Sequence, residues 1–100
     1  MKISNDILVP DYLVSLLIGK SGEIIRSIMN KSGSMITFQK EVNIDLIQYN
    51  DEFKINTVQG VMGRVCNIKG TPQQNSMALQ LISEMIIKLE TSLNGIRKEN

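Results

Sequence analysis

The stretch that decides the fold reads Val14-Ser15-Leu16-Leu17-Ile18-Gly19-Lys20-Ser21-Gly22. An apolar run ends here in two glycines three residues apart, with a lysine and a serine between them. Glycines permit backbone angles that other residues disfavour, and they remove side chains that would hold a ligand away from the backbone. The Gly-Lys-Ser-Gly sequence therefore predicts a sharp turn between two apolar segments, with an accessible backbone.

The segments on both sides of this turn have the pattern of helices. Asp11 is a good N-cap for a short, largely buried helix over residues 12–18, although periodicity alone also allows a strand there. After the turn, apolar residues recur at helical spacing over residues 23–31, at Ile24, Ile25, Ile28 and Met29. Gly33 suits the left-handed position that follows a helix. We therefore expect two helices joined by the turn.

Three apolar-rich segments further away have the pattern of strands: residues 3–9, 35–40 and 64–69. A last helix is expected after Gly70. Thr71 can cap it, Pro72 takes the first helical position, and Gln74 completes a capping box. Its apolar residues form one stripe over about four turns: Ala78, Leu81, Ile82, Met85, Ile86, Leu89 and Leu93. A stripe of this kind suits a helix that covers one face of a sheet.

Residues 41–62 fit neither pattern clearly. Alternating apolar residues from Val42 onward could extend the second strand, but asparagines, a glycine and four acids favour a long loop or an irregular hairpin. Asn94-Gly95 is expected to end the last helix and to leave residues 96–100 as a frayed tail. We therefore predict a single α+β domain over residues 1–100, with the element order β-α-α-β-β-α.

Composition limits the classes of function. Among the 100 residues, 42% are hydrophobic and 21% are charged, which suits one globular domain with a buried core. Lys and Arg number 11 against 10 Asp and Glu, so binding to a polyanion depends on where the charges lie. Residues 41–62 carry a net charge of −3, whereas residues 1–40 and 63–100 each carry +2. The chain is thus a basic module diluted by an acidic insert.

Several kinds of site are excluded by what the chain lacks. No apolar run approaches the ~18 residues of a membrane span, and the N-terminal residues lack the apolar core of a secretory signal. The chain has no His and a single cysteine, Cys66, which reads as a small buried hydrophobic residue. This composition excludes an internal disulfide, a zinc cluster and a histidine-activated nucleophile. We expect a protein of the nucleus or cytoplasm that is not an enzyme and holds no cofactor or metal.

The sequence resembles the K homology (KH) domain of the eukaryotic type, type I, in the hnRNP K, poly(C)-binding and Nova-like group. The matching positions are Val9-Pro10, residues 14–22, Ile25, Ile28, Ser32-Gly33, Ile36, residues 64–70, Ala78 and Ile82. They cover nearly the whole chain except residues 41–62. The resemblance implies a three-stranded antiparallel sheet packed against three helices. It also implies binding of single-stranded RNA or DNA, with about four nucleotides clamped between the G-x-x-G loop and a groove.

The expected site has a phosphate-binding part and a groove. Gly22 opens a helix whose free amides can point at a phosphate, and Lys20 adds a mobile positive charge beside Gly19 and Ser21. By resemblance, the groove has aliphatic walls and a basic residue of the third strand that donates to a base edge or a phosphate. These groove residues are Ile18, Ile25, Ile36 and Arg64. Arg26 could reach the nucleic-acid backbone beside the loop.

Each of these residues has a plainer interpretation. The loop could be a helix–helix turn without a ligand, the isoleucines could be core residues, and Arg26 and Arg64 could be solvated charges. Two site positions depart from the family pattern. Ser15 stands where the family usually has glycine, and Met29 stands where cytosine-preferring members hold an arginine. Methionine cannot donate a hydrogen bond, so no cytosine preference is carried over.

A second hypothesis comes from another class of function. The acidic insert, the low net charge and the methionines of the last helix also suit a KH-type module for protein–protein interaction or homodimerisation. Weak or absent oligonucleotide binding by a stable dimer would favour it. The leading hypothesis is a module that binds single-stranded RNA, in mRNA regulation or splicing.

Overall fold

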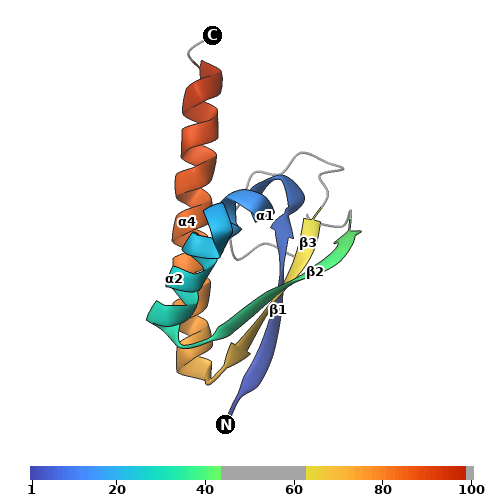
Figure 1. Ribbon diagram of the computed structural model, residues 1–100, viewed down its shortest axis with the longest axis vertical. Coiled ribbons are helices and arrows are strands. Elements are labelled where there is room, and N and C mark those ends of the chain that lie inside the picture. Colours follow the sequence, from blue (N-terminus) through green and yellow to red (C-terminus); the bar gives the residue numbers. More distant parts are fainter. Residues whose placement is uncertain (44–62, 99–100) are drawn as a thin grey trace.

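The computed structural model describes residues 1–43 and 63–98, with side chains for residues 1–40 and 63–93 (Figure 1). The elements follow in the order β1 (Ile3–Pro10), α1 (Asp11–Ile18), the 3-10 turn η1 (Lys20–Gly22), α2 (Glu23–Ser32), β2 (Met35–Asn43), β3 (Gly63–Gly70) and α4 (Pro72–Lys98). The predicted order of strands and helices is confirmed. The loop or hairpin expected over residues 41–62 lies outside the described residues, except that β2 continues to Asn43.

The sheet has the strand order β1-β3-β2, and both pairs are antiparallel. β1 pairs with β3 along its whole length, from Ile3 opposite Gly70 to Pro10 opposite Gly63. β2 pairs with β3 from Met35 to Phe38 and again at Val42 and Asn43. Between Phe38 and Val42 the register shifts, since β2 advances four residues there while β3 advances two. Such a bulge bends and twists the strand locally.

Within the described residues, α1, α2 and α4 all lie on one side of the sheet (Figure 1). Each strand and each α-helix contributes apolar side chains to the core that they enclose: Ile7 and Val9, Leu13, Val14 and Leu17, Ile25 and Ile28, Ile36, Cys66 and Ile68, and Ala78, Ile82 and Ile86. The stripe expected on the last helix is confirmed, because its remaining members, such as Leu81 and Leu89, are partly buried against this core.

The start of α1 differs from the prediction. Pro10 occupies the N-cap position, and no side chain caps the helix. Asp11 is the first helical residue and its carboxylate accepts hydrogen bonds from Arg64 instead. The expectation of Asp11 as N-cap was therefore wrong. The physical reason is that β1 runs directly into α1, which moves the cap position back by one residue.

The prediction for the start of α4 is confirmed, and the prediction for its end was wrong. The capping box at its start is present: the backbone N–H of Gln74 donates to Thr71 Oγ1 (3.1 Å), and the backbone N–H of Thr71 donates to Gln74 Oε1 (2.9 Å). The helix does not end at Asn94-Gly95 but continues to Lys98. A glycine inside a helix costs only about 1 kcal/mol relative to alanine, which is too little to end a long helix.

A buried polar cluster joins the beginnings of three elements. The Ser34 hydroxyl donates to Asn75 Oδ1 (2.8 Å), and Asn75 Nδ2 donates to the Ile3 carbonyl (3.1 Å) and to Asn5 Oδ1 (2.9 Å). Ser34 and Asn75 are only 3% and 5% exposed. Gly70 leaves room for this cluster, because a Cβ there would lie 2.9 Å from both Ser34 Oγ and Asn75 Oδ1. Asn75 thus fixes α4 to β1 and to the segment that enters β2.

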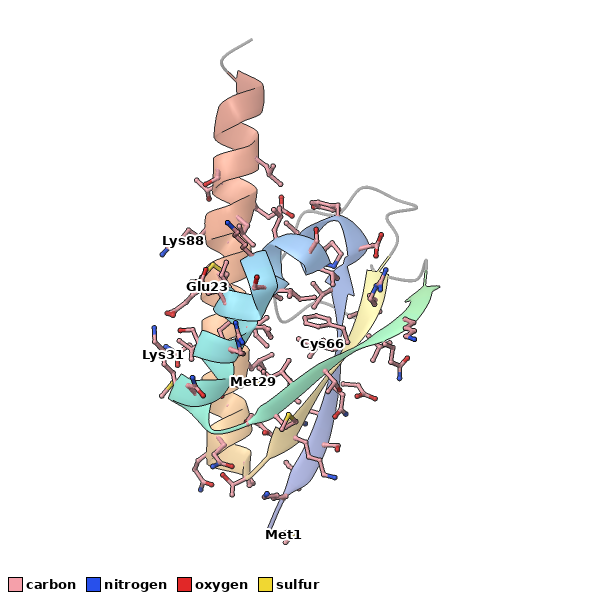
Figure 2. The ribbon with its side chains drawn as sticks, in the orientation of Figure 1. Met1, Glu23, Met29, Lys31, Cys66 and Lys88 are labelled. Carbon is pink, nitrogen blue, oxygen red and sulfur yellow. The ribbon has the colours of Figure 1, made fainter. Side chains whose placement is uncertain are left out.

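Cys66 lies at the centre of the sheet and is fully buried, as expected (Figure 2). Burial, and to a smaller extent the negative charge of Asp6, raises the pKa of its thiol from 9.0 to about 12. The unfolded chain loses this proton above about pH 9, whereas the folded chain retains it until about pH 12. The free energy of unfolding is therefore unaffected by this thiol below pH 9 and decreases between pH 9 and pH 12.

We expect this thiol to lower the free energy of unfolding by about 2 kcal/mol between pH 8 and pH 10.5, since each pH unit above 9 contributes about 1.4 kcal/mol. Urea denaturation of the wild type and of Cys66→Ala at several pH values measures the effect. The stability difference between the two proteins is expected to narrow as pH rises. A difference that stays constant to pH 10.5 would contradict the assigned pKa.

Candidate nucleic-acid interface

The predicted turn between the first two helices is present and sharply bent. Gly19 has φ +79° and ψ 176°, and a Cβ at this position would lie 2.8 Å from Ile24 Cγ1. Gly22 has φ +76° and ψ 17°, the left-handed conformation, at the N-cap position of α2. The Gly19 N–H donates to the Ser15 carbonyl (3.0 Å), and the Gly22 N–H donates to the Gly19 carbonyl (3.1 Å). Both glycines are thus required by the backbone path.

The outer surface of this loop is suited to an anion. Lys20 and Ser21 are exposed, and no side chain caps either η1 or α2. The N-terminus of a helix carries partial positive charge and N–H groups without intrahelical partners. Lys20 adds a full positive charge at the same place. The loop therefore combines the features that bind a phosphate group.

Arg26 lies beside the loop, as expected, and contacts it directly. Its Nη2 donates to the Ser21 carbonyl (2.7 Å), while the side chain is exposed. This bond holds the Ser21 peptide in place from the first turn of α2. Contact between Arg26 and a nucleic acid stays a prediction.

Ser21 has φ +56° and ψ 25°, and it is the only non-glycine residue with positive φ in the described part of the chain. This conformation costs about 1 kcal/mol or more for a residue with a Cβ. We expect Ser21→Gly to raise the free energy of unfolding by about 0.5–1 kcal/mol, after the greater freedom of glycine in the unfolded chain is subtracted. Urea denaturation measures this, with Ser21→Ala as the control that keeps the Cβ. Equal stability of the two variants would contradict strain at this position.

α2 separates two surfaces. Figure 2 shows Met29 on the side of α2 that faces β2, whereas Glu23 and Lys31 lie on the side next to α4, with Lys88 nearby. The second side borders a hollow of about 400 Å³ between α2 and α4. Its lining includes the apolar residues Ile24, Ile28, Leu81 and Met85.

The residues expected to line the groove differ in how far they are exposed to solvent. Ile25 and Ile36 are only 8% and 5% exposed and pack into the core. Ile18 and Met29 are partly buried at its edge, and Ser15 is exposed. Ile25 and Ile36 thus belong to the hydrophobic core, and their direct contact with bases stays a prediction.

The family model of the KH domain matches residues 4–84 of the chain. The chain belongs to the KH-domain family, type I. Its antiparallel sheet and helices are those of the type I fold, so the predicted fold class is confirmed. KH domains bind RNA or single-stranded DNA and are nucleic-acid-binding modules rather than enzymes. The match does not extend to the subgroup, which stays a prediction.

Arg64 of this KH domain is paired rather than free. It lies on the helix-facing side of β3, opposite Val9 of β1, and its Nε and Nη2 both donate to Asp11 Oδ1 (3.2 and 2.8 Å). The side chains of Arg64 and Asp11 are 29% and 40% exposed. The sequence suggested either a contact with a base edge or a phosphate, or a solvated charge, and neither interpretation included this ion pair. Asp11 carries no sequence signal for it, because 53 residues separate the partners.

In the described ranges 1–43 and 63–98, no helix is long and apolar enough to cross a membrane. No three His, Cys, Asp or Glu side chains in those ranges gather into a group that could hold a metal ion.

Proposed function

We propose that this KH domain binds single-stranded RNA, with single-stranded DNA as a chemically close substitute. About four nucleotides would lie between the Gly19–Gly22 loop and the side of α1 and α2 that faces β2. The observation that carries this proposal is the N-terminus of α2, which no side chain caps, with exposed Lys20 on a loop that both glycines keep bent. Such a site binds the sugar-phosphate chain independently of base identity.

Base contacts would come from the residues next to this loop. Ile18 and Met29 offer partly buried apolar surface, and Arg64 offers hydrogen-bond donors. Because Met29 cannot donate a hydrogen bond, a cytosine preference that depends on a donor at this position is not expected. Ile25 and Ile36 would act mainly as the floor beneath these contacts.

A single module of this size offers few phosphate contacts and little buried area, so its affinity is expected to be weak. Useful affinity would then come from several modules, from a homodimer or from a protein partner. We propose an intracellular role in mRNA regulation or splicing, in the nucleus or the cytoplasm.

The proposal is tested by titrating the ¹⁵N-labelled protein with short unpaired RNA and DNA oligonucleotides of random sequence. We expect amide shift changes at residues 19–26, and a decrease in affinity with increasing salt. The amide peaks of residues such as Ser4 and Lys69, whose side chains lie on the sheet face away from the helices, serve as the internal control. Unchanged shifts at residues 19–26 with every oligonucleotide would overturn the proposal.

A further inference from the structure

Within the described residues, the ion pair between Arg64 and Asp11 leaves one defined edge of the guanidinium without a partner. A guanidinium has five N–H groups in a fixed plane. Asp11 Oδ1 accepts one from Nε and one from Nη2, which together form the side edge of the group. The remaining N–H groups, two on Nη1 and one on Nη2, make no hydrogen bond to any residue of the described ranges. The neighbouring N–H groups of Nη1 and Nη2 are parallel donors.

Both partners are fixed in position by the fold. Asp11 is the first residue of α1 and directly follows β1, while Arg64 is the second residue of β3 and pairs with Val9 of β1. The carboxylate and the guanidinium are therefore attached to two adjoining parts of the same rigid sheet and helix. A guanidinium held in this way loses little conformational freedom when a ligand binds its remaining donors.

The carboxylate of Asp11 also changes what Arg64 can attract. An arginine without a partner binds a phosphate through its charge as well as through its paired N–H donors, and the contribution of the charge weakens steeply with salt. In this domain the carboxylate of Asp11 compensates the charge of Arg64, since Asp11 Oδ1 lies 2.8 Å from Arg64 Nη2. The free parallel donors keep their geometric preference for two neighbouring acceptors, which base edges provide. The pair is thus better suited to base recognition than to phosphate binding.

The ion pair also lies apart from the loop. α1 has eight residues, with Asp11 at its beginning and Gly19 after its end, which corresponds to about 12 Å along the helix. The loop and the ion pair would therefore contact different nucleotides of one strand.

We propose that Asp11 is a positioning residue that makes Arg64 a donor to a base edge instead of a phosphate contact. This inference rests on the proposed function and adds to it a residue that controls base discrimination. Removing the negative charge of Asp11 is expected to release Arg64 toward the phosphates. Binding would then become less selective and more dependent on salt.

The experiment compares Asp11→Asn with the wild type and with Asp6→Asn. Asp6→Asn is the matched control, since it makes the same charge change on the face of β1 opposite the helices, where Asp6 accepts a hydrogen bond from Asn67. Binding to the four RNA homopolymers is measured from 50 to 300 mM salt. For Asp11→Asn we expect the slope of log affinity against log salt to steepen by about 0.7, the value for one additional phosphate contact. We also expect about a tenfold loss of discrimination between the best and worst homopolymers.

The Arg64 Nε–H resonance gives a readout that does not depend on nucleic acid. In the wild type and in Asp6→Asn it is expected to exchange slowly with solvent, and in Asp11→Asn this protection is expected to be lost. If the wild type binds but Asp11→Asn matches Asp6→Asn in slope and discrimination, the inference is wrong and the proposed function stands. A steeper slope with unchanged discrimination also overturns it, because Asp11 would then only compensate charge. If the wild type binds no oligonucleotide, the proposed function fails and this inference fails with it.

Discussion

Replacing Lys20 and Ser21 together by aspartate is expected to lower the affinity for single-stranded RNA by about 100-fold, because two carboxylates then face the phosphates at the N-terminus of α2. The fold is expected to persist, since both side chains are exposed and aspartate tolerates the left-handed conformation of residue 21. Fluorescence anisotropy with a labelled random RNA pool measures the affinity. Far-UV circular dichroism checks the fold.

The chain offers a matched control for this variant. Ser4 and Lys69 are exposed and directly opposed on the sheet face away from the helices. Replacing both by aspartate changes the same residue types and the same net charge far from the loop. We expect this control to retain binding to within a few-fold, as long-range electrostatics are screened beyond about 10 Å. Equal losses in the two double variants would mean that only net charge matters, and the loop would not be the phosphate site.

Asn75→Ala is expected to lower the free energy of unfolding by about 3 kcal/mol. The substitution removes three hydrogen bonds and leaves the buried Ser34 hydroxyl without its acceptor. A buried polar group without a partner costs about 1–3 kcal/mol, and each lost bond adds to this. For a domain of this size the loss corresponds to a decrease in Tm of more than about 10 °C. Urea and thermal denaturation measure both quantities.

Two controls separate the cluster from the helix. Gln73→Ala changes an exposed amide side chain of the same helix turn and is expected to alter stability by less than about 0.5 kcal/mol. Ser34→Ala in the Asn75→Ala background removes the orphaned hydroxyl, so the double variant is expected to be more stable than the sum of the single effects predicts. Strict additivity would contradict direct coupling between Ser34 and Asn75.

The effect of Asn75 on nucleic-acid binding is expected to be indirect. The residue lies at the end of the sheet where β1 begins and where the chain enters β2. Its loss would reduce the fraction of folded protein without touching the loop. Binding measured at a temperature well below the lowered Tm is therefore expected to match that of the wild type.

Features that depend on neighbouring residues were predictable from the sequence. The turn at Gly19–Gly22 and the left-handed Gly33 follow from backbone sterics at single positions. The capping box of Thr71 and Gln74 follows from hydrogen bonds within one helical turn. Each of these preferences operates over a few residues, and the folded chain satisfies them all.

Two predictions at helix ends that rested on local preferences alone were wrong. Asp11 has the chemistry of an N-cap, but β1 runs directly into α1, so the cap position falls on Pro10 and the Asp11 carboxylate pairs with Arg64. Asn94 and Gly95 have the chemistry of a helix end, yet the helix continues to Lys98 because their propensities are weak.

The amino-acid order alone determined the element sequence, the bend between the first helices and the positive charge on it, because short-range sterics and periodicity govern these features. Tertiary structure alone decided that Arg64 is held by a carboxylate, that Ile25 and Ile36 lie beneath the surface, and that Asn75 joins three elements. These outcomes depend on strand register and on helix packing across 41 to 72 residues of chain. No local pattern encodes such separations, because the partners come within bonding distance only once the sheet has formed.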